Sequence, residues 1–228
     1  MSELLLHPAE LLRTPARAVQ RRAEPAEQSV TARRDLLTIT LGGLLFGAAV
    51  GSLRGGAQVP IAALKIPLAT LLTLAVSAPG FSAFAGAFGR RWSFRETLAV
   101  ALGAGARASL VLFALAPVLW LAIDLGASHQ GVRWLATIAY ALAGLSGLGF
   151  MLLAVGSGRG RWAITLSFAG LFLIVGAQSA WLLRPFIGDP RDAQVPLFAH
   201  GRREGGVVGS LWGGGEHGER ESQRGSGY

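Results

Sequence analysis

Two basic residues interrupt apolar segments of the chain, and such charges are the first candidates for chemistry or transport. Lys65 stands in "AALKIPLAT" and Arg107 in "GAGARASLV". A charge within a membrane is costly unless its side chain reaches the headgroup layer or meets a partner. Lys65 has a long stem and lies two residues before Pro67, which can free a carbonyl for the ammonium. We therefore favour a structural role for Lys65 over an ion path.

The role of Arg107 depends on where its helix begins. If Thr97–Leu125 is one helix, Arg107 lies near mid-depth, about 15 Å from the helix start at about 1.5 Å per residue. It would then need a partner from another element, because neither Glu96 nor Asp124 lies one turn away. If the span starts near Ala106, Arg107 is an interfacial anchor. The anchor is the interpretation that we favour.

Nucleophilic, metal and cofactor chemistry find little support. The "GLSG" stretch around Ser146 resembles the nucleophile motif of rhomboid intramembrane proteases, where a later helix supplies a His base. This sequence departs from that family, because its later histidines, His200 and His217, lie in the tail. His7 and His129 lack metal-ligand spacing, and the absence of cysteine excludes thiolate sites. We predict no enzyme, no metal and no cofactor.

Two glycine-rich stretches could bind or pack. The loop "GSGRGR", residues 156–161, could offer backbone donors to a phosphate or a lipid headgroup, but a short turn carrying topology charges is favoured. Gly43, Gly47 and Gly51 recur every four residues, which clears one helix face for the close approach of another backbone. That second helix could belong to a partner, a second copy or, as we favour, the same chain.

The elements that carry these residues are membrane helices. The 228-residue chain has a mean hydropathy of +0.46 and 15% charged residues, and its apolar residues form blocks long enough to cross a bilayer. The sequence predicts an all-α polytopic integral membrane bundle within residues 35–188. We expect about five spans, with four or six as alternatives and the third either one helix or an interfacial piece followed by a span. The predicted spans are 36–53, 59–78, 97–125, 132–155 and 162–183.

The net charge of +8 is spread around the spans. It forms no continuous basic face, so we predict no nucleic-acid partner. One set of loops holds only Arg54 and Arg133, whereas the N-terminal tail and the loops on its side are rich in arginine, which predicts a cytoplasmic N-terminus. The arginines on that side are Arg13, Arg17, Arg21, Arg22, Arg33, Arg34, Arg90, Arg91, Arg95, Arg159 and Arg161.

The two tails differ in composition. We expect no cleaved signal peptide in residues 1–34. Their leucines could form an amphipathic helix that turns Arg13, Arg17, Arg21 and Arg22 to anionic lipid headgroups. An irregular cytosolic tail is an equal alternative. Residues 189–228 are predicted to lie outside the membrane, with disorder after about residue 205, where apolar residues become scarce.

The last span ends in "QSAWLLRPFIGDPR", which predicts a structured cap. Trp181 suits the interface, Pro185 removes Arg184 from helical geometry, and a Gly-Asp-Pro turn follows. A simple stop and turn is the alternative. The predicted cap consists of Trp181, Arg184, Pro185, Phe186, Gly188, Asp189, Pro190, Arg203, Glu204 and Gly205.

Residues 62–206 resemble a group of uncharacterised bacterial polytopic membrane proteins. The resemblance is carried by "ALKIPLATLLTLAVSAPGFSAF", "RRWSFRETLAV", "LFALAPV", "QSAWLLRPFIGDP" and "RREGG". The group is similar in outline to Yip-like proteins, five-span trafficking proteins with a cytoplasmic N-terminus, which implies a multi-pass protein of the bacterial cytoplasmic membrane. By resemblance, the recurring positions are Lys65, Pro67, Glu96, Pro117, Arg184, Pro185, Gly188, Asp189, Pro190, Glu204 and Gly205.

These observations favour a non-enzymatic scaffold or accessory subunit. It would act through contacts with other membrane proteins or with a second copy of itself, within the lipid bilayer. The competing class is a transporter or channel for ions or small solutes, in which Arg107 and Lys65 face a polar path. A hydrophilic route normally needs more intramembrane polar residues than this sequence offers.

Overall fold

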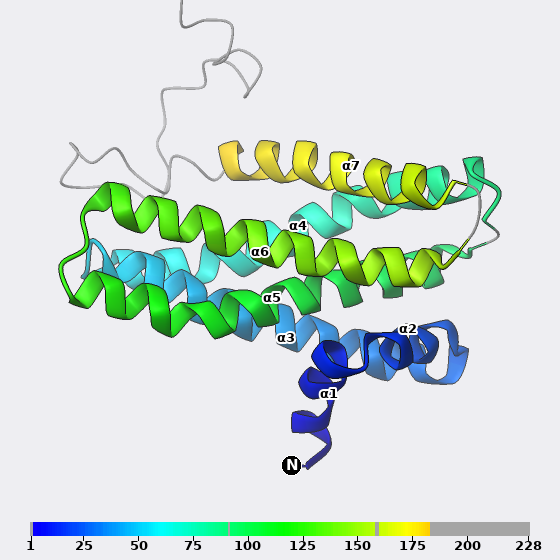
Figure 1. The fold of residues 1–228 in the computed structure, drawn as a ribbon, viewed down its shortest axis with the longest axis horizontal. Helices are drawn as coiled ribbons and strands as arrows, with labels where there is room; N and C mark the ends of the chain where they lie inside the picture. The colour runs from blue at the N-terminus through cyan, green and yellow to red at the C-terminus, as the bar shows by residue number, and fades with distance from the viewer. Residues whose placement is uncertain (1, 91, 158–159, 183–228) are drawn as a thin grey trace, which may run out of the picture. The chain divides into compact units, whose positions relative to one another are not determined.

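The computed structural model describes residues 2–90, 92–157 and 160–182, which form seven α-helices and no strand (Figure 1). In these residues four helices, α3 to α6, are long and apolar enough to cross a membrane, which confirms the predicted all-α polytopic bundle. The fifth predicted span corresponds to α7, whose shorter described apolar part is Arg161–Gly176. The helices are α1 (Ser2–Arg13), α2 (Pro15–Ala23), α3 (Pro25–Ser52), α4 (Gln58–Ala87), α5 (Phe94–Asp124), α6 (His129–Val155) and α7 (Arg161–Leu182).

Polar and glycine residues set the helix boundaries. Helix α5 begins with a capping box, in which the Ser93 hydroxyl accepts from the Glu96 backbone N–H and the Glu96 carboxylate accepts from the Ser93 N–H. At the start of α6 the Ser128 hydroxyl accepts from the Gly131 backbone N–H, without a reciprocal side-chain bond. Gly156 ends α6 at a φ of 68°, a backbone conformation that other residues rarely adopt.

Two helices are longer or more continuous than their sequences indicate. Helix α5 is a single helix of 31 residues, so the alternative of an interfacial piece followed by a span is wrong. The second span is predicted to end before Pro79. The helix does not end there, because α4 continues to Ala87. A proline removes one backbone hydrogen bond, but packing of the flanking turns can keep the helix intact.

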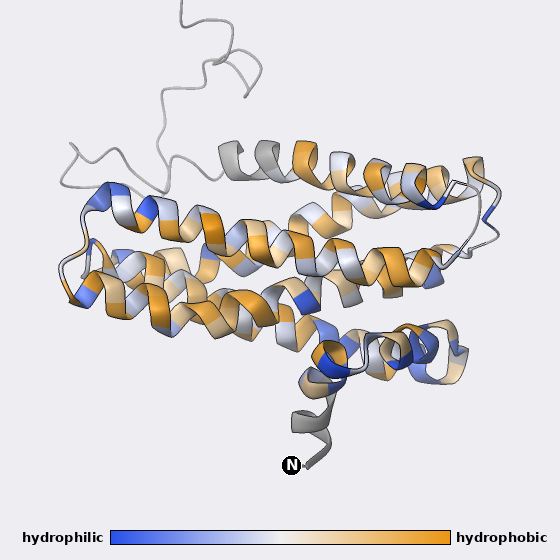
Figure 2. Ribbon diagram, viewed as in Figure 1, coloured by the Kyte–Doolittle hydropathy of each residue, from blue (hydrophilic) through white to orange (hydrophobic). Residues whose placement is uncertain are grey.

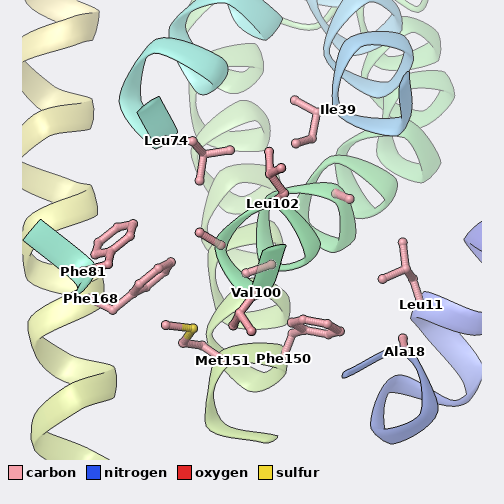
Figure 3. Packing of buried hydrophobic residues seen from close by; sticks show 13 residues of the cluster. Leu11, Ala18, Ile39, Leu74, Phe81, Val100, Leu102, Phe150, Met151 and Phe168 are labelled. Atoms are coloured by element: carbon pink, nitrogen blue, oxygen red, sulfur yellow. The ribbon is translucent and has the colours of Figure 1, made fainter. Parts of the chain in front are cut away.

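The described N-terminal residues fold onto the long helices instead of forming an irregular tail. Leu11 of α1 and Ala18 of α2 are buried in the main apolar cluster, together with residues of α3 to α7 (Figure 3). In that view Leu11 and Ala18 lie on one side of the cluster and the stacked rings of Phe81 and Phe168 on the other. Helix α3 runs from Pro25 without a break, so the predicted domain boundary at residues 34/35 lies inside a helix.

The outer surface of the long helices is apolar. Figure 2 shows hydrophobic residues along most of their length and hydrophilic residues gathered on α2 and near helix ends. On α4 a ridge of every fourth residue is 43 to 57% exposed, formed by Leu64, Leu68, Leu72 and Val76. Such a surface suits a hydrocarbon environment, where an exposed leucine carries no penalty.

Candidate functional site

A buried ion pair joins α2 to the N-terminal half of α3. Arg22 and Asp35 are 1% and 0% exposed. The Arg22 Nε donates to Asp35 Oδ2 at 3.0 Å and Nη2 donates to Oδ1 at 2.5 Å, which is the bidentate geometry of a strong charge-assisted bond. The remaining terminal nitrogen, Nη1, donates to the Ala18 carbonyl at 2.6 Å. The pair therefore fixes α2 to α3.

Two residues of the neighbouring helices complete the environment of the Arg22 side chain. Its guanidinium carbon lies 5.2 Å from the ring centroid of Phe150 on α6, within cation–π range. A Cβ atom on Gly103 of α5 would collide with Arg22 Nε and would lie 2.8 Å from Phe150 Cε1. The absence of a side chain at residue 103 thus makes room for the guanidinium.

The prediction that Arg22 faces lipid headgroups is therefore wrong, because Asp35 offers it a carboxylate inside the protein. Arg21 instead lies 48% exposed beside the carboxylates of Glu10 and Glu27, at 3.3 and 3.6 Å. Sequence reasoning missed the buried pair. A signal was present: Asp35 is a lone acid at the entry to an apolar span, where an unpaired carboxylate would be costly.

Arg107 lies near the middle of α5 and not at its start. The helix begins at Phe94, so Arg107 is about 20 Å along it, and the interfacial-anchor interpretation is wrong. Its Nε donates to the Ser146 Oγ of α6 at 3.0 Å. Ser146, in the stretch that resembles the protease motif, is thus a hydrogen-bond acceptor for Arg107. This bond provides the partner from another helix that a mid-helix charge requires.

Lys65 and Arg107 lie on two helices that contact each other, α4 and α5. Lys65 lies near the start of α4, and its Nζ is buried. A Cβ on Gly105, two residues before Arg107, would meet the Leu74 side chain of α4 at 2.8 Å. A Cβ on Gly42 would meet the Ser109 backbone and a Cβ on Gly43 would meet Pro67, so Ser109 of α5 and Pro67 of α4 lie at about the same level. Lys65 and Arg107 are each two residues from these positions.

The glycine face of α3 packs against α4, which confirms internal packing. Cβ atoms built on these glycines would meet α4 backbone, at 2.5 Å from the Ala62 carbonyl oxygen for Gly47 and 2.8 Å from the Gln58 carbonyl oxygen for Gly51. Gly43 faces Pro67 in the same antiparallel arrangement. This face is occupied within the chain and is not free for a partner.

The predicted C-terminal cap, possible metal-ligand groups and the cavity provide no further candidate site in the described residues. The side chains of the predicted C-terminal cap, from Trp181 to Gly205, lie outside the described residues. In the part of the chain that the structure describes, no three His, Asp or Glu side chains could hold a metal ion. An apolar cavity between α4, α5, α6 and α7 has a volume of about 10 Å³, enough for one water molecule.

Comparisons with known proteins give no further guide to the site. No protein-family model, curated protein or solved structure matches the chain.

Proposed function

We propose that this protein is a non-enzymatic integral membrane scaffold or accessory subunit that works through contacts with other membrane proteins or with a second copy. One observation carries the proposal: groups that could perform chemistry are used to hold the bundle together. Arg107 bonds Ser146, Arg22 bonds Asp35, and the α3 glycines receive α4. A catalytic site would instead leave a nucleophile beside a base and near a space for substrate.

A transporter or channel for ions or small solutes is the second candidate, and the mid-helix position of Arg107 favours it. Against it, the cavity between α4 and α7 has a volume of about 10 Å³, room for one water molecule and not for a solute path. Arg107→Leu distinguishes the two functions. A correctly folded variant that loses flux in liposomes would establish the transporter, whereas a scaffold would keep its partners.

We propose that the protein lies in the bacterial cytoplasmic membrane, as its resemblance to bacterial polytopic membrane proteins implies, with the N-terminus in the cytoplasm. Charge at the two ends of the bundle supports this orientation. The end where α3 and α5 begin carries Arg17, Arg33 and Arg95 on exposed positions, together with the arginines of the adjoining loops. The opposite connections contribute Arg54 and Arg133. Arginine near span ends is retained on the cytoplasmic side.

The experiment that tests the proposal is purification from the native membrane in a mild detergent through a small N-terminal tag. A scaffold or accessory subunit is expected to retain a second membrane protein, or a second copy, at fixed stoichiometry. Arg107→Leu should leave that stoichiometry unchanged in folded protein. A monomer without partners that catalyses solute flux after reconstitution would overturn the scaffold function.

A further inference from the structure

Two connecting segments lie side by side at the arginine-rich end of the bundle. Arg90, after α4, donates from Nη2 to the backbone carbonyl of Val155 at the end of α6. A Cβ on Gly160, just before α7, would lie 3.7 Å from the Phe88 ring. Figure 1 shows the ends of α4 and α6 and the starts of α5 and α7 at this same end. Tertiary folding thus brings Arg90 and Arg161, the first residue of α7, to one region.

The Arg161 side chain has a buried N–H donor to which the described residues offer no hydrogen-bond acceptor. Its Nε is buried and has no hydrogen-bond partner among the described residues. The guanidinium carbon lies 5.9 Å from the Trp162 ring centroid, within cation–π range. This contact uses the face of the guanidinium and provides no acceptor for its N–H donors. A buried donor without an acceptor costs free energy, and its preferred acceptor is an anion.

Apolar and aromatic surface adjoins this guanidinium. Trp162 is 63% exposed and Phe88 is 42% exposed, at helix ends where aromatic side chains suit a membrane interface. The small cavity between α4 and α7 is lined by Phe84, Trp92 and other mostly apolar residues. A ligand for this region should therefore combine a negative charge with an apolar body.

We propose that Arg161, assisted by Arg90, binds the phosphate of an anionic phospholipid, with the acyl chains against Trp162 and Phe88. Arginine presents N–H donors in a planar fork that matches two phosphate oxygens, and the phosphate supplies the acceptor that Nε lacks. The aromatic surface selects a lipid over a free phosphate, which would leave that surface unused. Lipid binding here goes beyond a scaffold role and requires no protein partner.

The test measures lipid binding by native mass spectrometry and by thermal unfolding in detergent. Probes are phosphatidylglycerol, phosphatidylcholine and inorganic phosphate, and the variants are Arg161→Gln and its matched control Arg133→Gln at the opposite end. We expect phosphatidylglycerol to bind more tightly than phosphatidylcholine. Arg161→Gln should weaken it about tenfold or more, the scale of a charge-assisted bond, while Arg133→Gln leaves it unchanged.

Two outcomes would overturn the lipid site. Equal affinity of wild type and folded Arg161→Gln for phosphatidylglycerol would remove Arg161 from the site. An equal response of the wild type to inorganic phosphate and to phosphatidylglycerol would show an anion site with no lipid selectivity. If Arg161→Gln fails to fold, Arg161→Lys keeps the charge but loses the planar fork, and unchanged affinity in it would also refute the proposal.

Discussion

The buried Arg22–Asp35 pair should fasten the N-terminal helices to the bundle, and Asp35→Ala tests this directly. Both side chains are at most 1% exposed, so the variant leaves a guanidinium buried without its carboxylate. Removal of one member of such a pair costs about 3–5 kcal/mol. If that cost is relieved by release of α1 and α2, their opening equilibrium rises by about 100-fold or more.

Hydrogen exchange of the backbone amides in detergent measures this opening, since amides of residues 10–23 exchange when α1 and α2 detach. Glu27→Gln is the matched control, because it breaks an ion pair at 3.6 Å between side chains about half exposed, worth at most about 1 kcal/mol. A double variant, Arg22→Met with Asp35→Leu, should recover most of the protection, since no charge is left buried.

Equal exchange rates in Asp35→Ala and Glu27→Gln would refute the reasoning, because the buried pair would then contribute no more than an exposed one. A double variant that opens as readily as Asp35→Ala would show that packing and not the uncompensated charge holds the helices.

Three further substitutions test the packing of the bundle by thermal unfolding. Gly103→Ala should cost about 1–3 kcal/mol by overpacking, because its Cβ collides with the Arg22 side chain, whereas Gly149→Ala, with no atom within 4 Å, should not destabilise. Gly47→Ala should lower the melting temperature of the isolated protein, because its Cβ would lie 2.5 Å from an α4 carbonyl oxygen, and an effect no larger than that of Gly144→Ala would contradict internal packing. Ser146→Ala should cost about 1–3 kcal/mol through loss of the Arg107 acceptor, and unchanged melting would show that the bond is not needed.

The sequence by itself determined the class of protein and the elements. Long apolar blocks predict spanning helices because the hydrocarbon core demands about 20 apolar residues per crossing. The Gly43, Gly47 and Gly51 period predicts close helix packing, since a face without side chains admits another backbone. The Ser93-to-Glu96 spacing that begins α5 is local and visible in the sequence. The sequence also allows a span that starts near Ala106, because the residues before and after Ala106 are both apolar.

Tertiary structure decided which polar groups meet. Arg22 and Asp35 are 13 residues apart, Arg107 and Ser146 are 39 apart, and Arg90 and Val155 are 65 apart. Composition places these arginines near spans, but an arginine at a span end can equally face a headgroup, a carbonyl or a carboxylate. The choice among them depends on which helix lies opposite and at what level, and that is settled only when the helices pack.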